Sequence, residues 1–260
     1  MGKTNNVYIL KARRKRRIKR GIVLTVIIAG VLALFVTKSD FFLIKNVNIK
    51  GNSIIKTEAI LKDADSFKGE NLLFIKENNV ISKIKSNPYI DNVTIKRSLP
   101  KTLEIDVTEK NVAYYFKGKE SFDILSSDLI LLEKSNKIDD KNLIEITGLK
   151  KDDLKIGEYV ASGDSFTILK TTLDELYKIQ KSNKSKFKVT KVDVSSLTNM
   201  KVYFGDVMVK IGDGEDLVKK INTAIAILED KSVNLKKGYI DVSFHGSPVI
   251  KKEKDKEKEN

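Results

Sequence analysis

The sequence contains no cysteine, no tryptophan, three prolines and one histidine among its 260 residues. Without cysteine the chain has no disulfide, no thiolate metal site and no cysteine nucleophile. The single imidazole, His245, cannot assemble the usual zinc sites, which need several His or Cys ligands. A chain of this length can bury a sizeable core without disulfides. We therefore predict no metal centre and no cofactor.

Recognisable catalytic patterns are also missing. A Ser–His–Asp arrangement would have to use His245, and no nucleophile-elbow motif accompanies it, so we interpret this residue as a solvated turn residue. Gly212-Asp213-Gly214 resembles a dinucleotide loop, but Leu217 occupies the place of the third glycine and no βαβ repeat surrounds it. A Ser–Lys dyad stays open. No pattern in the sequence points to a catalytic site or to a small-molecule substrate.

The positive charge is concentrated at the N-terminus. The formal net charge is +14, and residues 1–20 contribute nine basic side chains and no acidic one. The tail 251–260 adds one positive charge, which leaves +4 for residues 21–250. A basic protein often binds nucleic acid, but here the excess lies directly before an apolar run. The charge distribution therefore predicts a membrane topology signal and no nucleic-acid partner.

One uninterrupted apolar run follows this basic stub. Gly21–Thr37 has no charged residue over 17 positions, about 25 Å of helix at 1.5 Å per residue. Basic residues crowd only its N-terminal side, so the positive-inside rule places the N-terminus in the cytoplasm. A cleaved signal peptide is the alternative, but Phe35–Lys38 is a poor small-residue cleavage site. We expect a retained single-pass anchor with most of the chain on the extracytoplasmic side.

Residues 41–110 have the pattern strand, helix, helix, strand, strand. We predict a strand over Phe42–Lys50, helices over 57–64 and 71–86, and strands over Ile90–Arg97 and Thr102–Glu109. Asn87-Pro88 ends the second helix, because the residue before proline avoids the α region. We predict one shared core for seven apolar side chains: Val47, Ile49, Leu72, Ile84, Val93, Ile95 and Ile105.

Residues 111–250 read as short strands with two amphipathic helices. The helices are predicted over Phe166–Ile179 and from Glu215 to about Leu228, each with an apolar stripe at helical spacing. A strand is predicted over Tyr239–Phe244, where side chains alternate between the two faces and place Ile240, Val242 and Phe244 on one of them. A turn and a short final strand, Pro248–Ile250, precede the charged tail 251–260, which we expect to be disordered.

Four segments together resemble one bacterial family. They are "FFLIKNVNIKGN" at 41–52, "NPYIDNVTIKRSLPKTLEIDVTEKNVAYYF" at 87–116, "LIEITGL" at 143–149 and "KKGYIDVSFHGSPVI" at 236–250. Following a basic stub and a single span, they resemble the cell-division proteins called FtsQ, or DivIB in Gram-positive bacteria. The resemblance covers nearly the whole chain. It rests on the order and spacing of loosely specified segments and on no catalytic signature.

The resemblance implies an α+β protein in five parts. These are a cytoplasmic stub (1–20), a transmembrane helix (21–37), a POTRA domain with β-α-α-β-β order (41–110), a mostly antiparallel β domain (111–250) and the tail (251–260). It further implies a non-enzymatic protein of the cell membrane, concentrated at the division septum. Such proteins bind the small bitopic proteins FtsB (DivIC) and FtsL and help control septal peptidoglycan synthesis.

The C-terminal segment is the predicted binding site. Proline cannot donate to a β-ladder, so Pro248 suits a sheet edge. A terminal edge strand leaves N–H and C=O groups that an incoming strand can complete. In the family this region carries the FtsB (DivIC) contact, so the resemblance implies a set of contact residues: Phe244, Gly246, Ser247, Val249 and Ile250. The alternative, in which these residues only finish the sheet, stays open.

Two other function classes stay open at this point. One is a membrane-anchored cell-wall hydrolase or transferase, against which the lack of a convergent acid or nucleophile motif counts. The other is a POTRA-bearing secretion or assembly component, which would normally continue into a transmembrane β-barrel. Here two soluble amphipathic helices interrupt the strands after residue 110.

Overall fold

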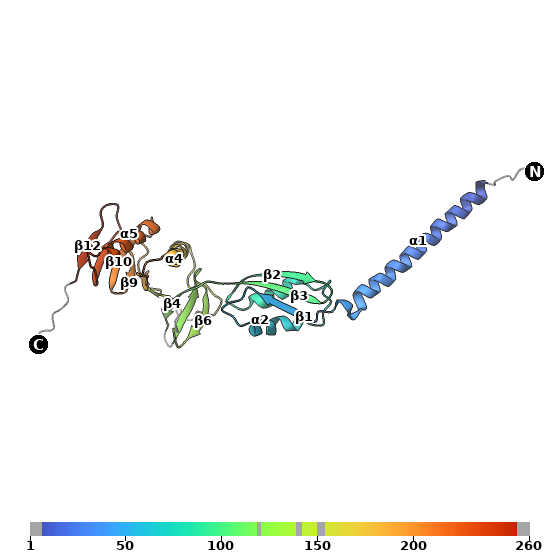
Figure 1. Ribbon diagram of the computed structural model, residues 1–260, viewed down its shortest axis with the longest axis horizontal. Coiled ribbons are helices and arrows are strands. Elements are labelled where there is room, and N and C mark those ends of the chain that lie inside the picture. Colours follow the sequence, from blue (N-terminus) through green and yellow to red (C-terminus); the bar gives the residue numbers. More distant parts are fainter. Residues whose placement is uncertain (1–6, 119–120, 139–141, 150–153, 254–260) are drawn as a thin grey trace, which may run out of the picture. The chain divides into compact units, whose positions relative to one another are not determined.

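The computed structural model describes residues 7–118, 121–138, 142–149 and 154–253 (Figure 1). The chain divides into two compact units, which are described separately. The first unit runs to Ser86 and includes Asn92–Thr108; the second takes Asn87–Asp91 and the chain from Glu109 onward. Thus a five-residue segment from the middle of residues 42–110 packs with the second unit.

The N-terminal helix of the first unit, α1, spans Val7–Lys38 and joins much of the basic stub to the apolar run. Among the described residues, one helical stretch, Arg13–Lys38, is long and apolar enough to cross a membrane, and none of its apolar window is buried within the protein. The helix ends where Ser39 begins a short 3-10 turn, η1 (Asp40–Phe42), and caps the backbone N–H of Phe41 with its side chain at 3.1 Å.

The remainder of the first unit has the predicted β-α-α-β-β order. Its elements are β1 (Asn46–Lys50), α2 (Thr57–Ala64), the short η2 (Asp65–Phe67), α3 (Glu77–Lys85), β2 (Ile90–Ser98) and β3 (Thr102–Glu109). The three strands form a sheet in the order β1-β3-β2, in which β1 runs parallel to β3 (Figure 1). Helix α2 packs against α3 and β1. The order of elements is confirmed.

The core of this unit follows the position of each strand in the sheet. Strand β3 lies in the centre, and its inward side chains Leu103 and Ile105 are fully buried. Val47, Ile49 and Ile95 were predicted to share that core, but they are only half-buried. These three residues lie on the edge strands β1 and β2, whereas Val93, also on β2, is buried as predicted.

The second predicted helix is shorter than the sequence suggested. The prediction ran from 71 to 86, whereas α3 begins at Glu77. Asn71 instead forms a β-bridge with Leu43, and the N–H of Leu72 donates to the carbonyl of Phe42 at 2.8 Å. These bonds use backbone groups that a helix would need. For the same reason the predicted strand from Phe42 begins only at Asn46.

The second unit is built on a nine-stranded mixed sheet. Its strands are β4 (Val112–Lys117), β5 (Phe122–Ser126), β6 (Leu131–Ser135), β7 (Ile144–Thr147), β8 (Lys191–Asp193), β9 (Met200–Phe204), β10 (Val207–Gly212), β11 (Gly238–Asp241) and β12 (Val249–Lys252). In the part of the chain that is described, their order is β12-β11-β10-β9-β8-β7-β4-β5-β6. The pairs β4/β7, β7/β8 and β10/β11 are parallel, and the other five are antiparallel. The mostly antiparallel character is confirmed.

Two helices pack together and contribute to the core of this sheet. They are α4 (Asp164–Ser182) and α5 (Leu217–Glu229). Helix α4 buries its predicted apolar stripe, and α5 does so except at Val218, which was predicted on the same face but is exposed. Fully buried Tyr114 on β4 donates its hydroxyl hydrogen to the carbonyl of Leu173 in α4. This bond satisfies a polar group that burial would otherwise leave unpaired, and it fixes α4 against the central strands.

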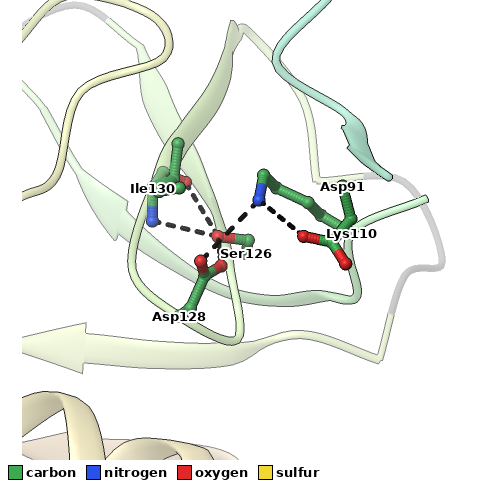
Figure 2. Close-up of polar contacts among 5 residues, drawn as sticks. All are labelled: Asp91, Lys110, Ser126, Asp128 and Ile130. Atoms are coloured by element: carbon green, nitrogen blue, oxygen red, sulfur yellow. Dashed lines mark hydrogen bonds and ion pairs between the residues drawn. The ribbon is translucent and has the colours of Figure 1, made fainter. Parts of the chain in front are cut away.

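A polar cluster holds the Asn87–Asp91 segment within the second unit. Figure 2 shows the ammonium of Lys110 between two carboxylates, at 3.2 Å from Asp91 and 3.8 Å from Asp128. Buried Ser126 donates to Asp128 at 2.5 Å and accepts the backbone N–H of Ile130 at 2.9 Å. The cluster therefore ties the β5–β6 turn to the residue that follows β3.

Tyr89 adds a second attachment of the same segment. Its backbone carbonyl accepts the N–H of Lys110 at 2.7 Å, and its hydroxyl bonds to the side chain of Glu133 on β6. Burial, followed by the negative charge of Glu133, raises the pKa of the Tyr89 hydroxyl above its ordinary value. Tyr89 is consequently a neutral donor at any physiological pH.

Candidate partner-binding edge

The outermost strand of the sheet is β12, at its C-terminal border. It pairs antiparallel with β11, and among the described residues no strand lies on its other side (Figure 1). All four residues of β12 are exposed. We call Val249–Lys252 the β12 edge. It is the C-terminal border of the sheet in the part of the chain that is described.

The hydrogen-bond register shows which backbone groups face outward. Glu253 donates its N–H to the carbonyl of Lys237, so this pair is a hydrogen-bonded pair of the ladder. Hydrogen-bonded and non-hydrogen-bonded pairs alternate along antiparallel strands. In the observed register, Lys252 lies opposite Gly238 and Ile250 opposite Ile240. The N–H and C=O groups of Ile250 and Lys252 therefore point away from β11 and are available to an incoming strand.

Gly238 permits β12 to lie this close. Its φ is +127°, and a Cβ at this position would lie 2.0 Å from the backbone carbonyl oxygen of Lys251. Any side chain at 238 would push β12 away from β11. Sequence reasoning missed this residue, although Gly238 lies inside the quoted segment "KKGYIDVSFHGSPVI".

The loop before β12 begins earlier than predicted. The alternation predicted a strand to Phe244, but β11 ends at Asp241. The Asp241 carboxylate accepts both the N–H and the hydroxyl of Ser243, at 3.1 and 2.6 Å. Such an Asx turn bends the chain out of the ladder. Val242 stays buried, whereas Phe244, predicted on the same face, is about half exposed.

The five predicted contact residues lie together at this border of the sheet. Phe244, Gly246 and Ser247 occupy the exposed loop, and Val249 and Ile250 begin β12. Phe244 and Val249 are each nearly half exposed, and Ile250 is 38% exposed. Because Ile250 pairs with buried Ile240, it extends the apolar face of the sheet to its border.

The final strand was predicted to end at Ile250, yet it includes Lys251 and Lys252, the first two residues of the predicted tail. Residues 254–260 of that tail lie outside the described residues.

The charges beside this edge fix the end of β11. Burial raises the pKa of the Asp241 carboxyl, but the hydrogen bonds from Ser243 and the charge of Lys210, at 3.3 Å, outweigh it. The net result is a pKa below the ordinary aspartate value. The Lys210 ammonium also lies 4.5 Å from the centre of the Tyr239 ring. Asp241 is thus held ionised as a structural turn former.

This geometry supports recognition of an extended peptide. It offers outward backbone donors and acceptors, an apolar Ile250–Val249 step and an exposed aromatic ring at Phe244. His245 is exposed in the same loop. Among the described residues, no group of three or more His, Cys, Asp or Glu side chains is arranged to hold a metal ion.

Comparison with known proteins identifies the family. Residues 42–110 match the family model described as "POTRA domain, FtsQ-type". Over 249 residues the chain is 34% identical to "Cell division protein DivIB" of Clostridium botulinum strain Hall, with 95% of this chain and 96% of that protein covered. It is 35% identical to the protein of the same name from strain Loch Maree, with the same coverage, and 34% identical to that of Clostridium acetobutylicum, covering 95% and 98%.

This chain belongs to the FtsQ/DivIB family of bacterial cell-division proteins. The identity extends over both units and over the N-terminal helix, because nearly the whole chain is covered. The predicted family and the predicted α+β fold with a POTRA domain are therefore confirmed. The β12 edge is accordingly a feature of a cell-division protein.

Proposed function

We propose that this protein uses its β12 edge to bind a small bitopic division protein of the FtsB/DivIC type. In this proposal the partner adds a strand to the sheet, and an FtsL-type protein joins the same complex. The protein acts at the septum without catalysis of its own and helps control septal peptidoglycan synthesis through this assembly.

The observation that carries the proposal is the unpaired outer side of β12. Ile250 and Lys252 present their backbone groups outward, beside the exposed ring of Phe244. Strand addition takes its affinity from main-chain hydrogen bonds and its specificity from neighbouring side chains. The family relationship supports a partner from the division machinery, because the relatives are named cell division proteins.

A single substitution separates the backbone contact from the side chain. Lys252→Pro removes one outward N–H, whereas the inward bonds of β12 to β11 remain. We expect binding of the purified DivIC-type partner, measured by calorimetry, to weaken about tenfold, or about 1.4 kcal/mol. The matched variant Lys252→Ala keeps the N–H and should bind as the wild type does. Equal affinity of both variants, with unchanged melting temperatures, would refute strand addition.

The orientation in the membrane belongs to the same proposal. We propose that α1 crosses the cell membrane once, with its basic start in the cytoplasm and with the rest of the first unit and the whole second unit outside. A reporter fused after residue 116 should be extracytoplasmic and stay with the membrane fraction. A shortened, soluble fusion would instead identify the apolar run as a cleaved signal.

Septal position and the lack of catalysis need their own measurements. A fluorescent fusion should gather at midcell in dividing cells, and a uniform membrane signal would contradict the septal role. The purified chain should neither cleave nor join peptidoglycan. Release of muropeptides by the wild-type chain would revive the hydrolase alternative.

A further inference from the structure

The first unit exposes three large apolar side chains from three separate segments. Phe41 is 48% exposed, Phe74 is 60% exposed and Leu99 is 59% exposed. Single exposed apolar residues are common on soluble domains, but a contiguous exposed group marks a surface that contacts something. The contacts of Lys101, Arg97 and Asn71 place these three side chains at one end of the unit.

Lys101 links Phe41 to the turn that contains Leu99. Its ammonium lies 5.8 Å from the centre of the Phe41 ring. Its carbonyl accepts the N–H groups of Lys45 and Asn46 at 3.0 and 3.2 Å, at the start of β1. Leu99 stands two residues earlier, in the turn between β2 and β3. Lys101 therefore connects Phe41 with the β2–β3 turn that carries Leu99, at the end of the sheet where β1 and β3 begin.

Arg97 links the same turn to Phe74. Its guanidinium donates to the carbonyl of Leu73 at 3.1 Å and to that of Ile75 at 3.2 Å. These two residues flank Phe74, so the Arg97 head lies against the backbone that carries the Phe74 ring. Phe74 and Leu99 therefore lie on either side of Arg97, at the same end of the sheet.

The apolar helix leaves from this end as well. Ser39 alone separates α1 from η1, which contains Phe41. The Asn71 side chain donates to the carbonyl of Val36 in the last turn of α1 at 2.8 Å, and the Phe35 and Phe41 rings are 6.0 Å apart. Whatever α1 is embedded in must lie within reach of all three exposed side chains.

We propose that Phe41, Phe74 and Leu99 form a lipid-facing patch, which enters the headgroup region of the bilayer that α1 crosses. The inference rests on the proposed membrane span. A tether of a few residues keeps the patch at high effective concentration beside the lipid surface. Aromatic rings with nearby basic groups are the side chains that favour this interface, as Phe41 and Lys101 do here. In this proposal the first unit contacts the membrane through α1 and also through three further segments: η1, the residues before α3, and the β2–β3 turn.

The absence of tryptophan allows a direct test in the full-length protein. Phe74→Trp and Leu99→Trp would each place a single indole in the patch, in chain reconstituted into phospholipid vesicles. Ile54→Trp is the matched control: Ile54 is 52% exposed and follows the opposite end of β1, where Lys50 pairs with Asp106. Leu34→Trp marks the span itself. Each vesicle preparation is compared with one whose lipids are brominated near the headgroup end of the acyl chains.

We expect bromine to quench Phe74→Trp and Leu99→Trp clearly, with blue-shifted emission, and to leave Ile54→Trp unchanged. Quenching of Leu34→Trp without any quenching at positions 74 and 99 would overturn the patch while the span stands. No quenching of Leu34→Trp would overturn the span and the patch together. A blue shift at 74 and 99 that appears only after the division partner is added would assign the surface to a protein.

Discussion

The two edge strands of the nine-stranded sheet differ in whether another segment of the backbone pairs with them. At the β6 edge, the segment 157–160 runs alongside: Leu131 donates to the carbonyl of Glu158 at 2.9 Å and accepts from Gly157 at 2.7 Å. Tyr159 adds an isolated bridge to Ile130. The β12 edge has no such cover among the described residues, and each of its residues is exposed. The chain therefore pairs the start of the β6 edge with its own backbone, whereas the β12 edge has no such neighbour among the described residues.

This difference makes β12 the better candidate for the proposed partner contact. Open edges are a liability that soluble proteins usually cover, twist or charge. The β6 edge is covered where it begins, at Leu131, although it lies in the same sheet as β12. The β12 edge carries two lysines but no covering segment among the described residues, and Gly238 lets the strand dock closely, which agrees with its proposed use by a partner.

The largest expected difference between the edges is in stability. Leu131→Ala, at a fully buried position of β6, should lower the free energy of unfolding by about 2–5 kcal/mol. Ile250→Ala, on the β12 edge, should cost about 0.5 kcal/mol or less. Urea unfolding of both variants measures the difference. Similar losses at both positions would mean that β12 is packed like β6.

The next effect concerns the docking of β12. Gly238→Ala would place a methyl group against the Lys251 carbonyl and impose strain of about 1–3 kcal/mol. We expect β12 amides to lose hydrogen-exchange protection and partner affinity to fall with them. Gly205→Ala is the control, because Gly205 also has a positive φ, +60°, whereas a Cβ there meets nothing within 4 Å. Unchanged protection in Gly238→Ala would show that β12 does not depend on this glycine.

A smaller effect is expected for the aromatic contact. Phe244→Ala removes an exposed ring beside β12 and should weaken partner binding by about 1–2 kcal/mol, with an unchanged melting temperature. Tyr159→Ala, beside the covered β6 edge, should leave the affinity unchanged. If both variants bound equally well, the aromatic contact of the proposed interface would be wrong.

The smallest expected effect is a dependence on pH. The folded pKa of Asp241 is depressed, so its stabilisation is complete above the unfolded value, about 3.9, and is lost as the pH falls through the folded value. The melting-temperature difference between wild type and Asp241→Asn should therefore shrink below about pH 4. The exposed Asp206→Asn in the β9–β10 turn provides the baseline. A constant difference from pH 7 to the acid range would contradict the assigned role of Asp241.

Much of the fold could be predicted because apolar periodicity is local. Strand β3 agrees residue for residue with the predicted Thr102–Glu109, and α2 with the predicted 57–64. The start of α3 could not be predicted, since Asn71 and Leu72 bond to residues about thirty positions away. The packing of Asn87–Asp91 with the second unit depends on Lys110, Asp128 and Glu133, whose proximity no local pattern reveals.

The candidate site was predictable in position but not in detail. Pro248 and the alternation before it indicated a sheet edge, and β12 does lie at the border of the sheet. The early end of β11 required knowledge of the Asp241–Ser243 turn, which competes with the ladder for the backbone. The need for Gly238 appears only when the distance to Lys251 is known. The use of these residues in binding remains a proposal.

The lysines at the end of β12 have a consequence for solubility. If copies of this strand stacked in parallel register, as in a growing fibre, Lys251 would lie on Lys251 and Lys252 on Lys252. Antiparallel pairing centred on the strand would set the same ammonium groups against Ile250 and Val249. Like charges and mismatched pairs directly opposite each other are unfavourable in a ladder. The open edge therefore resists polymerisation of the protein with itself, even where many copies are crowded together.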